Sequence, residues 1–398
     1  MPRETSPSGI LEWIIGNVRP GASDSAGLRY ERIEPQASAG LPEIHTPLNA
    51  HDPAHWFRRG LIWDYVLALE GAASVLDVGP GEGWPSLLLA PHFREVVGIE
   101  PGPRRVAACR ANAARLRVEK ARFEEMSACR MAFADGSFDG VVAASAIEQT
   151  PDPTAALREI FRVLKPGGVL RMSYEAVEEQ AEPVREALAV RAGPEGNYCI
   201  DYVLVRREPA TEEGFLLEVV PATEAQRARL AQCAERCSGD GLPHRDPRLE
   251  RGLAQTVLAI EKREIAGARR FTLHHFRTRF LLSGLQRIGF ENVRLIVGGG
   301  WPARQVAQEL ARSQRSAAGA PLMEELCRAG AAIGLALETV RPGEVIARKP
   351  SGRAPVRKAG GRAGGRGVPR RPSRSRPGAA RAPRTSSRTV KRAGKGPR

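Results

Sequence analysis

The stretch VLDVGPGEGWPS, residues 75–86, constrains the fold of this 398-residue chain more than any other segment. A short apolar run ends at Asp77, and three glycines follow at Gly79, Gly81 and Gly83 before a proline that can begin a helix. Glycine allows positive φ and lets a ligand approach where a Cβ would otherwise stand. A helix N-terminus offers free N–H groups to such a ligand. The pattern predicts a strand, a ligand-binding loop and a helix.

Alternating apolar runs and helical patterns continue from Ala72 to Tyr174, which is typical of βαβ units and a parallel sheet. Asp152 is a good N-cap, Pro153 suits the first helical position, and apolar residues follow at helical spacing. We expect strands at SVLDV, EVVGIE, near Phe123, and at FDGVVAA, GVLRMSY and, last in the chain, GEVIARK.

The predicted fold is α/β: a Rossmann-like, doubly wound, mostly parallel sheet of about seven strands, with an α/β cap insertion and a disordered basic tail. In the cap we expect a hairpin of DYVLVRR and GFLLEVV, then helical segments as far as Arg270. The expected parts are an N-terminal helical or lid segment (1–70), the ligand-binding core (71–174), the substrate cap (175–270), the rest of the core (271–350) and the tail (351–398).

The spacing of the glycine loop narrows its ligand. A dinucleotide fingerprint beginning at Gly79 would need glycine where Trp84 stands, and a phosphate-binding Walker loop would need a lysine that this loop lacks. The acids Asp77 and Glu82 would repel a pyrophosphate but attract the cationic groups of S-adenosylmethionine. Glu100, at the tip of the next strand, is placed to accept hydrogen bonds from ribose hydroxyls.

With these features the chain resembles the class I S-adenosylmethionine-dependent methyltransferases, in particular the type-11 group. The similar stretches are VLDVGPGEG, VVGIEP, AFADGSFDGVVAASAIEQTPDP and LREIFRVLKPGG. The alternative is an α/β domain whose glycine loop only turns the chain. The resemblance implies that Asp77, Gly79, Gly81 and Gly83 hold the methionine part of the cofactor, that Glu100 holds its ribose, and that Ala144 lines it.

Two positions depart from the family pattern. Ser127 stands where relatives usually have an Asp that contacts the adenine amino group, although the backbone N–H of Ala128 could still serve the ring. Gln149 replaces a histidine that many relatives have. These departures permit, without requiring, a cofactor-binding protein that has lost activity.

Methyl transfer is an in-line displacement, so a general base is needed only when the nucleophile must lose a proton. The chain lacks (D/N)PP(Y/F) and a Pro-Cys nucleophile, which makes methylation of nucleic-acid bases unfavoured. The catalytic residues are unknown; the weak candidates are Glu148, just past the fourth strand, and His275, beside His274. The pair His51 and His55 with Trp56 could belong to a lid, although packing is the simpler interpretation.

The net charge of +15 arises in the tail, because residues 351–398 hold 16 Lys or Arg and no acid. Such a tail would bind nucleic acid nonspecifically or another acidic partner, or would simply be solvated.

The six cysteines indicate reduced thiols, and a metal site at Cys233, Cys237 and His244 lacks a fourth ligand. We therefore expect a soluble cytoplasmic protein with no metal, no membrane span and a small-molecule acceptor, its oligomeric state being unknown. The alternative is a nucleic-acid-associated methyltransferase or binding protein recruited through its tail.

Overall fold

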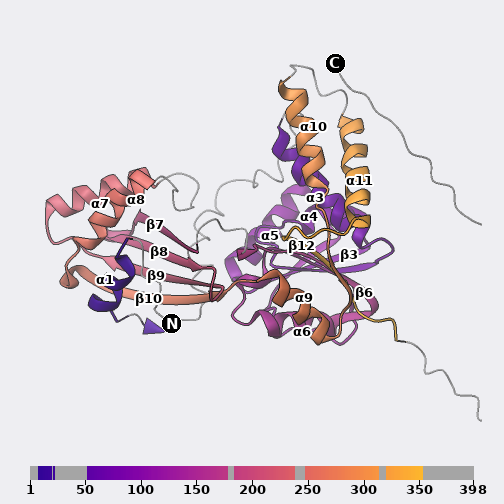
Figure 1. Cartoon of the computed structure of the whole chain (residues 1–398), viewed down its shortest axis with the longest axis horizontal. Coiled ribbons are helices and arrows are strands. Elements are labelled where there is room, and N and C mark those ends of the chain that lie inside the picture. Colours follow the sequence, from indigo (N-terminus) through magenta and orange to yellow (C-terminus); the bar gives the residue numbers. More distant parts are fainter. Residues whose placement is uncertain are drawn as a thin grey trace, which may run out of the picture. The chain divides into compact units, whose positions relative to one another are not determined.

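The computed structural model describes residues 8–19, 21–22, 52–177, 183–237, 247–312 and 320–352 (Figure 1). The predicted basic tail, apart from its first two residues, lies outside these ranges, as do His51 and His244. Within the described ranges, no helix combines the length and the apolar character that crossing a bilayer requires.

The core is a seven-stranded sheet, and the predicted mostly parallel architecture is confirmed. Six strands run in the same direction, and only β12 runs antiparallel to its two neighbours. The strands, in sheet order, are β11 (Glu291–Leu295), β12 (Glu344–Arg348), β6 (Leu164–Ser173), β5 (Phe138–Ala144), β2 (Ser74–Val78), β3 (Glu95–Glu100) and β4 (Ala121–Glu125). The central strands are apolar and buried along their length because helices cover both faces of the sheet.

Helices on the two faces belong to separate apolar clusters. On one face, Leu157 and Ile160 pack with Leu281 and Leu285 against the strands. On the other face, Ile62 packs against the sheet in a second cluster. The helices around the sheet are α3 (Pro53–Ala68), α4 (Ser86–Leu89), α5 (Pro103–Leu116), α6 (Pro153–Val163) and α9 (Thr278–Ile288). The α6 helix begins as its sequence predicts, with the Asp152 carboxylate accepting the backbone N–H of Ala155 at 2.9 Å.

The cap contains a second sheet. Its strands, in sheet order, are β1 (Gly21–Ala22), β10 (Ile265–His274), β9 (Thr211–Val219), β8 (Tyr198–Arg206) and β7 (Val184–Ala192). The hairpin expected from DYVLVRR and GFLLEVV is present as β8 and β9. The helical expectation as far as Arg270 is wrong, because residues 265–274 form β10, which pairs antiparallel with β9 and buries Phe271 and Leu273.

The N-terminal residues divide between two parts of the molecule. The helix α1 (Ile10–Asn17) inserts Ile10 and Ile14 into the apolar cluster of the cap, together with residues of α7 (Glu224–Arg236) and α8 (Pro247–Leu258). The α3 helix belongs instead to the core. The single N-terminal segment expected over residues 1–70 is therefore two structural pieces.

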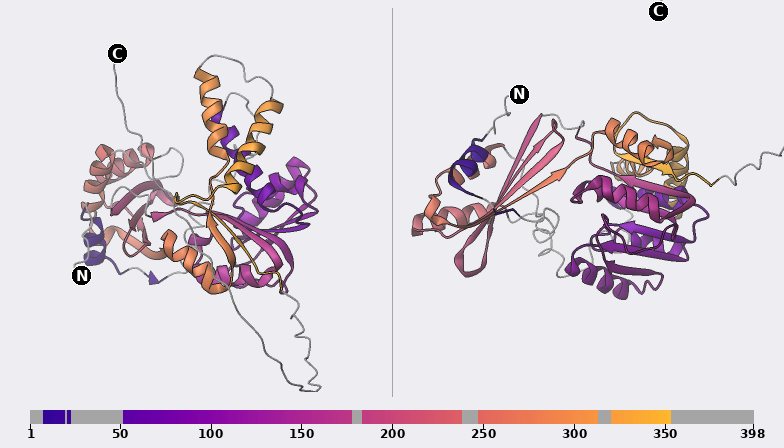
Figure 2. Two further views of the ribbon diagram at one scale, coloured as in Figure 1. Left: turned by 45° about the vertical axis from the view of Figure 1, so that its right-hand side comes forward. Right: turned by 90° about the horizontal axis from the view of Figure 1, so that it is seen from below.

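Three helices pack beside one another at one side of the core, α3 with α10 (Gly300–Arg312) and α11 (Ala320–Ala336) (Figures 1 and 2). The glycine segment Gly298–Gly300 allows this close packing. A Cβ placed on Gly60 would lie 2.6 Å from the Cα of Gly300. Trp56 is fully buried among these helices, so its role is packing, as the simpler interpretation held.

Candidate functional site

The glycine loop after β2 requires its glycines. Gly79, Gly81 and Gly83 have φ of +76°, +62° and +114°, in the left-handed region that other residues rarely adopt. A Cβ on Gly79 would stand 2.5 Å from the Cβ of Ala146, so the loop lies directly against the segment that follows β5. The helix after the loop, α4, has only four residues. The glycines rather than a long helix therefore shape this site.

Asp77 is fully buried at the end of β2. One of its carboxylate oxygens, Oδ2, accepts hydrogen bonds from the backbone N–H and the hydroxyl of Ser86, at 3.0 and 2.5 Å. The other oxygen, Oδ1, accepts no hydrogen bond from any described residue. Burial raises the pKa of Asp77 to about 8 despite the two bonds from Ser86. A buried carboxylate with an unused oxygen fits a cationic ligand group.

Glu100 ends β3 next to Asp77 and is only 2% exposed. Its Oε1 accepts the backbone N–H of Gly81 at 2.5 Å, which ties the strand tip to the glycine loop. From α5, the Cys109 thiol lies 3.2 Å from the Gly81 carbonyl, and the Asn112 amide donates to the Glu82 carbonyl at 2.9 Å. These two loop contacts were not predicted from the sequence, although the three-residue spacing of Cys109 and Asn112 places both side chains on one helix face.

The remaining predicted cofactor residues lie at the same carboxyl edge of the sheet. Ala144 ends β5, and Ser145 after it has φ of +51°. Ser127 follows β4, is exposed, and its hydroxyl accepts the N–H of Cys129 at 3.3 Å. Ala128 is buried in the core. The fold therefore gathers these residues near Asp77 and Glu100, and their roles as ligands stay predictions.

The two weak catalytic candidates, Glu148 and His275, are brought together by the fold. Glu148, in the short helix η4 (Ile147–Gln149), is 3% exposed, and its Oε1 accepts the N–H of Glu175 at 3.0 Å. Burial raises its pKa, although backbone hydrogen bonds and the nearby His275 act in the opposite direction. The Nε2 of His275 lies 3.0 Å from a carboxylate oxygen of Glu212. Glu212, a residue of the cap strand β9, was not predicted from the sequence.

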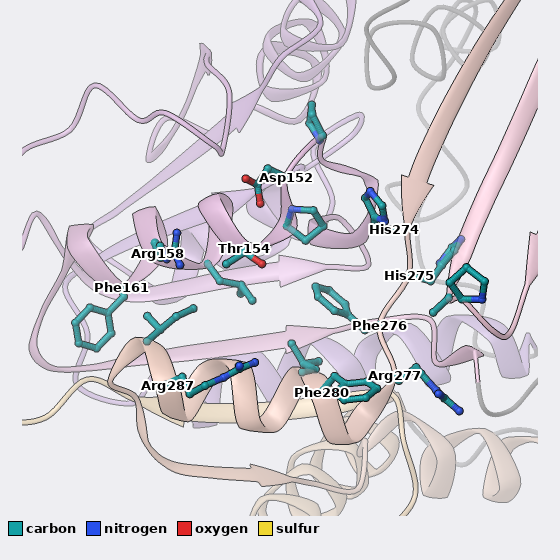
Figure 3. Close-up of a pocket in the computed structure, with 18 of the residues that line it drawn as sticks. Asp152, Thr154, Arg158, Phe161, His274, His275, Phe276, Arg277, Phe280 and Arg287 are labelled. Carbon is teal, nitrogen blue, oxygen red and sulfur yellow. The ribbon is translucent and has the colours of Figure 1, made fainter.

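A groove of about 1380 Å³ runs between α6 and α9 and reaches both His274 and His275. Figure 3 shows the two histidines and Phe276 toward one end and Phe161 at the other, with Arg158 and Arg287 on the two helices. The turn between β8 and β9, which includes Glu208, also lines the groove. Core and cap residues thus contribute to one concave surface, and ligand pockets occur preferentially where two such parts of a protein meet.

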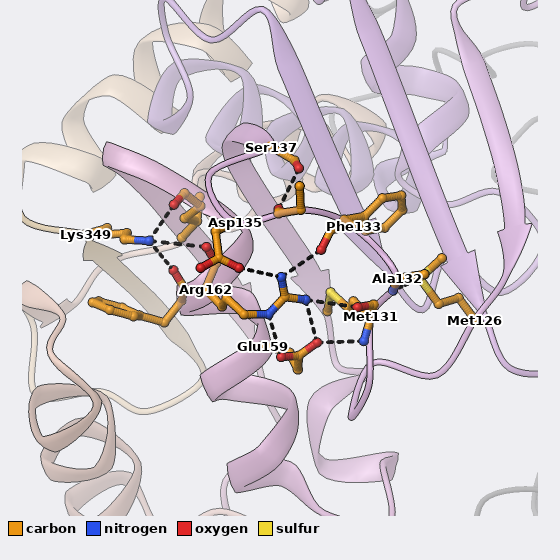
Figure 4. A network of polar contacts seen from close by, with 12 residues as sticks. Met126, Met131, Ala132, Phe133, Asp135, Ser137, Glu159, Arg162 and Lys349 are labelled. Atoms are coloured by element: carbon orange, nitrogen blue, oxygen red, sulfur yellow. Dashed lines mark hydrogen bonds and ion pairs between the residues drawn. The ribbon is translucent and has the colours of Figure 1, made fainter.

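An arginine on α6 holds the loop before β5 in place (Figure 4). The Arg162 guanidinium donates to the carbonyls of Phe133 and Met131 at 2.7 and 2.9 Å, and it forms ion pairs with Asp135 and Glu159. These bonds raise the pKa of Arg162 and lower that of Glu159. The contact joins the stretch FADGSFD, which includes Phe133 and Asp135, to the helix that carries Arg162.

The described residues contain no group of three or more His, Cys, Asp or Glu arranged to hold a metal ion. Cys233 and Cys237 lie within or beside the apolar cluster of the cap.

Comparison with known proteins agrees with this geometry. The family model described as "Methyltransferase domain" matches residues 76–172. An uncharacterized methyltransferase of Mycobacterium sp. (strain JLS) is 38% identical over 104 residues, which cover 26% of this chain and 39% of that protein. A probable S-adenosylmethionine-dependent methyltransferase of Mycolicibacterium smegmatis is 35% identical over 120 residues, covering 30% and 45% of the two chains.

Among solved structures, the YcgJ protein from Bacillus subtilis is similar at 29% identity and a TM-score of 0.28, covering 30% of this chain and 50% of that one. This chain thus spans half or less of the length of these relatives. The matched segment, residues 76–172, contains the glycine loop, Glu100 and the loop held by Arg162. These residues form a domain of the class I S-adenosylmethionine-dependent methyltransferase family, whose cofactor is S-adenosylmethionine.

Proposed function

We propose that this chain is an enzyme that transfers the methyl group of S-adenosylmethionine to O, N or C of a small-molecule acceptor by direct SN2-like displacement. The proposal rests on one observation: at the carboxyl edge of the sheet, the glycine loop lies beside the buried side chains of Asp77 and Glu100. When bound, the cofactor supplies a methyl group on a positively charged sulfur. Asp77, Gly79, Gly81 and Gly83 would hold its methionine part, Glu100 its ribose, and Ser127, Ala128 and Ala144 would line the site.

The chain's own residues would hold the reacting groups in position and shield them from water. The contacts from Cys109 and Asn112 hold the glycine loop, and the contact between Gly79 and Ala146 joins it to the segment after β5. A loop fixed on both sides can hold a methyl group in line with a nucleophile, which is where most of the rate of such a displacement arises. The cap contributes Glu208 and Pro209 to the groove and so would form part of the acceptor site.

A second candidate, methyl transfer or binding directed to nucleic acid, is favoured by one observation, the 16 basic residues of the tail. Arginines without interleaved aromatics would neutralise phosphates without reading bases. Deleting residues 351–398 separates the candidates. If the first is correct, turnover of a small-molecule acceptor survives the deletion; if the second is correct, the deletion abolishes turnover on the true substrate.

Binding of the cofactor is expected to change the protonation state of Asp77. Because Asp77 has a pKa of about 8 in the unliganded protein, it is largely protonated at pH 7. A cationic group bound beside it would favour the carboxylate, so binding should release a proton. Affinity should accordingly rise between pH 6 and pH 8. Calorimetric titration of S-adenosylmethionine in two buffers of different ionisation enthalpy measures the protons released.

Matched variants make this test specific. Asp77→Asn, whose amide oxygen can still accept from Ser86, should abolish proton release and weaken binding at least about tenfold, as expected for losing one charged hydrogen bond. Glu100→Gln should weaken binding similarly. Glu95→Gln, at the opposite end of the same strand, should change neither quantity. Absence of binding by the folded wild-type protein would overturn the proposed function.

A further inference from the structure

We infer that His275, oriented by Glu212, is the general base of the transfer, and that the acceptor is a hydroxyl-bearing anion bound in the groove between α6 and α9. This inference rests on the proposed function and names the acceptor class and the proton acceptor that it leaves open. Three features of the described residues support it: the orientation of the imidazole, the position of a second carboxylate, and the charge of the groove.

The orientation of His275 follows from its partner. A carboxylate can only accept hydrogen bonds, so the Glu212 oxygen 3.0 Å from Nε2 places the proton of the neutral imidazole on Nε2. The other nitrogen, Nδ1, then carries a lone pair, and it has no hydrogen-bond partner among the described residues. The His275 side chain is 5% exposed, and its backbone N–H donates to Ala210 at 3.0 Å. A base held by a third group in this way is prepared to accept a proton.

A second buried carboxylate, that of Glu148, lies near His275. Glu148 lies within electrostatic reach of His275, and its Oε2 accepts no hydrogen bond from the described part of the chain. The same segment contacts the glycine loop, because Ala146, two residues earlier, is the neighbour that a Cβ on Gly79 would meet. The segment 146–148 therefore lies against the glycine loop at Ala146 and near His275 at Glu148.

The charge of the groove indicates the acceptor. Its two acids are already engaged: Asp152 caps α6, and Glu208 pairs with Arg277 at 3.0 Å. Neither Arg158 nor Arg287 forms an ion pair with any acid that the structure describes, and both are exposed. Two such arginines, one on each wall, would attract a carboxylate or phosphate.

The apolar residues of the groove suit the body of such a molecule. Phe276 and Phe280 line the groove beside the histidines (Figure 3). A base is required when the nucleophile is a hydroxyl, because its proton must leave during attack. The hydroxyl oxygen forms a bond to the methyl carbon while the methyl–sulfur bond breaks, its electron pair remaining on sulfur as a thioether. The hydroxyl proton passes to Nδ1 of His275 and then to solvent.

The test uses the full chain labelled with ¹⁵N-histidine. The chain contains seven histidines, so the His275 resonances are assigned by their loss in His275→Gln. The expected spectrum shows neutral His275 protonated on Nε2. Adding 4-hydroxybenzoate should shift the Nδ1 resonance through a new hydrogen bond, whereas benzoate, which lacks the hydroxyl, should leave it unchanged. A neutral tautomer protonated on Nδ1, or no response to 4-hydroxybenzoate, would overturn the inference.

Variants separate the roles of the residues. Glu212→Gln, whose amide can donate to Nε2, should move the proton to Nδ1 and abolish the response to the hydroxyl probe. His275→Gln should lower methylation of 4-hydroxybenzoate about 100-fold, within the usual range for loss of a general base. The control His92→Gln, at a histidine of the core that does not line the groove, should lower it less than about threefold. Methylation that is equally fast in His275→Gln and wild type would contradict the inference.

Titration of S-adenosylmethionine into the same samples distinguishes failure of the proposed function from failure of the assignment of His275. The His275→Gln and Glu212→Gln variants should bind the cofactor as the wild type does, because Glu212 lies on β9 and His275 directly after β10, whereas the glycine loop follows β2 of the core. If the wild type fails to bind it, the proposed function fails. If the wild type and both variants bind it but the probe leaves Nδ1 unchanged, only the assignment of His275 and of the acceptor class fails.

Discussion

Replacing Gly79 with valine is expected to weaken binding of S-adenosylmethionine more than about 100-fold, because two penalties combine at this position. A β-branched residue is strained at φ of +76°, which costs about 1–3 kcal/mol. Its Cβ would also stand 2.5 Å from the Cβ of Ala146, and relieving such overpacking costs a further amount of about 1–3 kcal/mol. The glycine loop must move to relieve the strain and the overpacking, and the cofactor would then lose its contacts with the loop. Calorimetric titration measures the loss.

Gly71 provides the matched control for this substitution. It has φ of +84°, so valine there meets the same backbone strain, but a Cβ on Gly71 would have nothing within 4 Å. Gly71→Val should therefore lower the melting temperature and leave cofactor affinity unchanged. A Gly79→Val protein that binds the cofactor within fivefold of the wild type, or a Gly71→Val protein that loses binding, would show that the contact with Ala146 does not shape the site.

The sheet of the core could be predicted from the sequence because its signals are local. Apolar strands alternate with helical patterns, and Asp152 and Pro153 mark the start of α6 in the manner that the structure confirms. The glycine loop was recognised for the same reason, since glycine spacing and a strand-tip acid lie within one short stretch.

The cap was less predictable because its elements depend on distant partners. Residues 265–274 form a strand because β9 is beside them, and the run Ala-Gly-Ala-Arg-Arg within it gives no local strand signal. The helices α10 and α11 were not identified either. Their packing depends on glycines, such as Gly334, whose Cβ would lie 2.1 Å from the carbonyl oxygen of Val297.

The candidate site was predicted only in part for a related reason. Glu148 and His275 could be named singly, but their proximity arises from the fold, which places η4 against the end of β10. Glu212 had no signal at all, since a single acid on an alternating strand is normally a solvated residue. The pairing of β9 with β10, which brings Glu212 beside His275, involves residues far apart in the sequence.

The other large expected effect concerns a buried arginine that no local pattern could have revealed. Arg171, on β6, is fully buried; its guanidinium lies 2.6 Å from a Glu344 oxygen, 3.7 Å from an Asp64 oxygen and 5.1 Å from the centre of the Tyr65 ring. Asp64 also accepts the N–H of Gly299 at 2.9 Å. The cluster thus joins the sheet to α3 and to the glycine turn before α10.

Arg171→Met should destabilise the protein by about 3–5 kcal/mol, because it leaves a buried acid without its cation. The loss should depend on pH. Burial raises the pKa of Asp64 to about 7, although Arg171 lowers it, so without the arginine the pKa should rise further. A folded-state pKa above the unfolded value means that stability falls as pH rises through it. Urea unfolding should therefore show a larger loss at pH 8 than at pH 6.

Two comparisons test whether the buried charge is the cause. Arg122→Met removes an arginine whose ion pair with Glu95 is nearly half exposed, and it should cost less than about 1 kcal/mol. Adding Asp64→Asn and Glu344→Gln to Arg171→Met removes the uncompensated charges while keeping side-chain volume. If the argument holds, this triple variant regains more than half of the lost stability and loses the pH dependence. A triple variant as unstable as Arg171→Met at both pH values would assign the effect to packing of the arginine side chain instead.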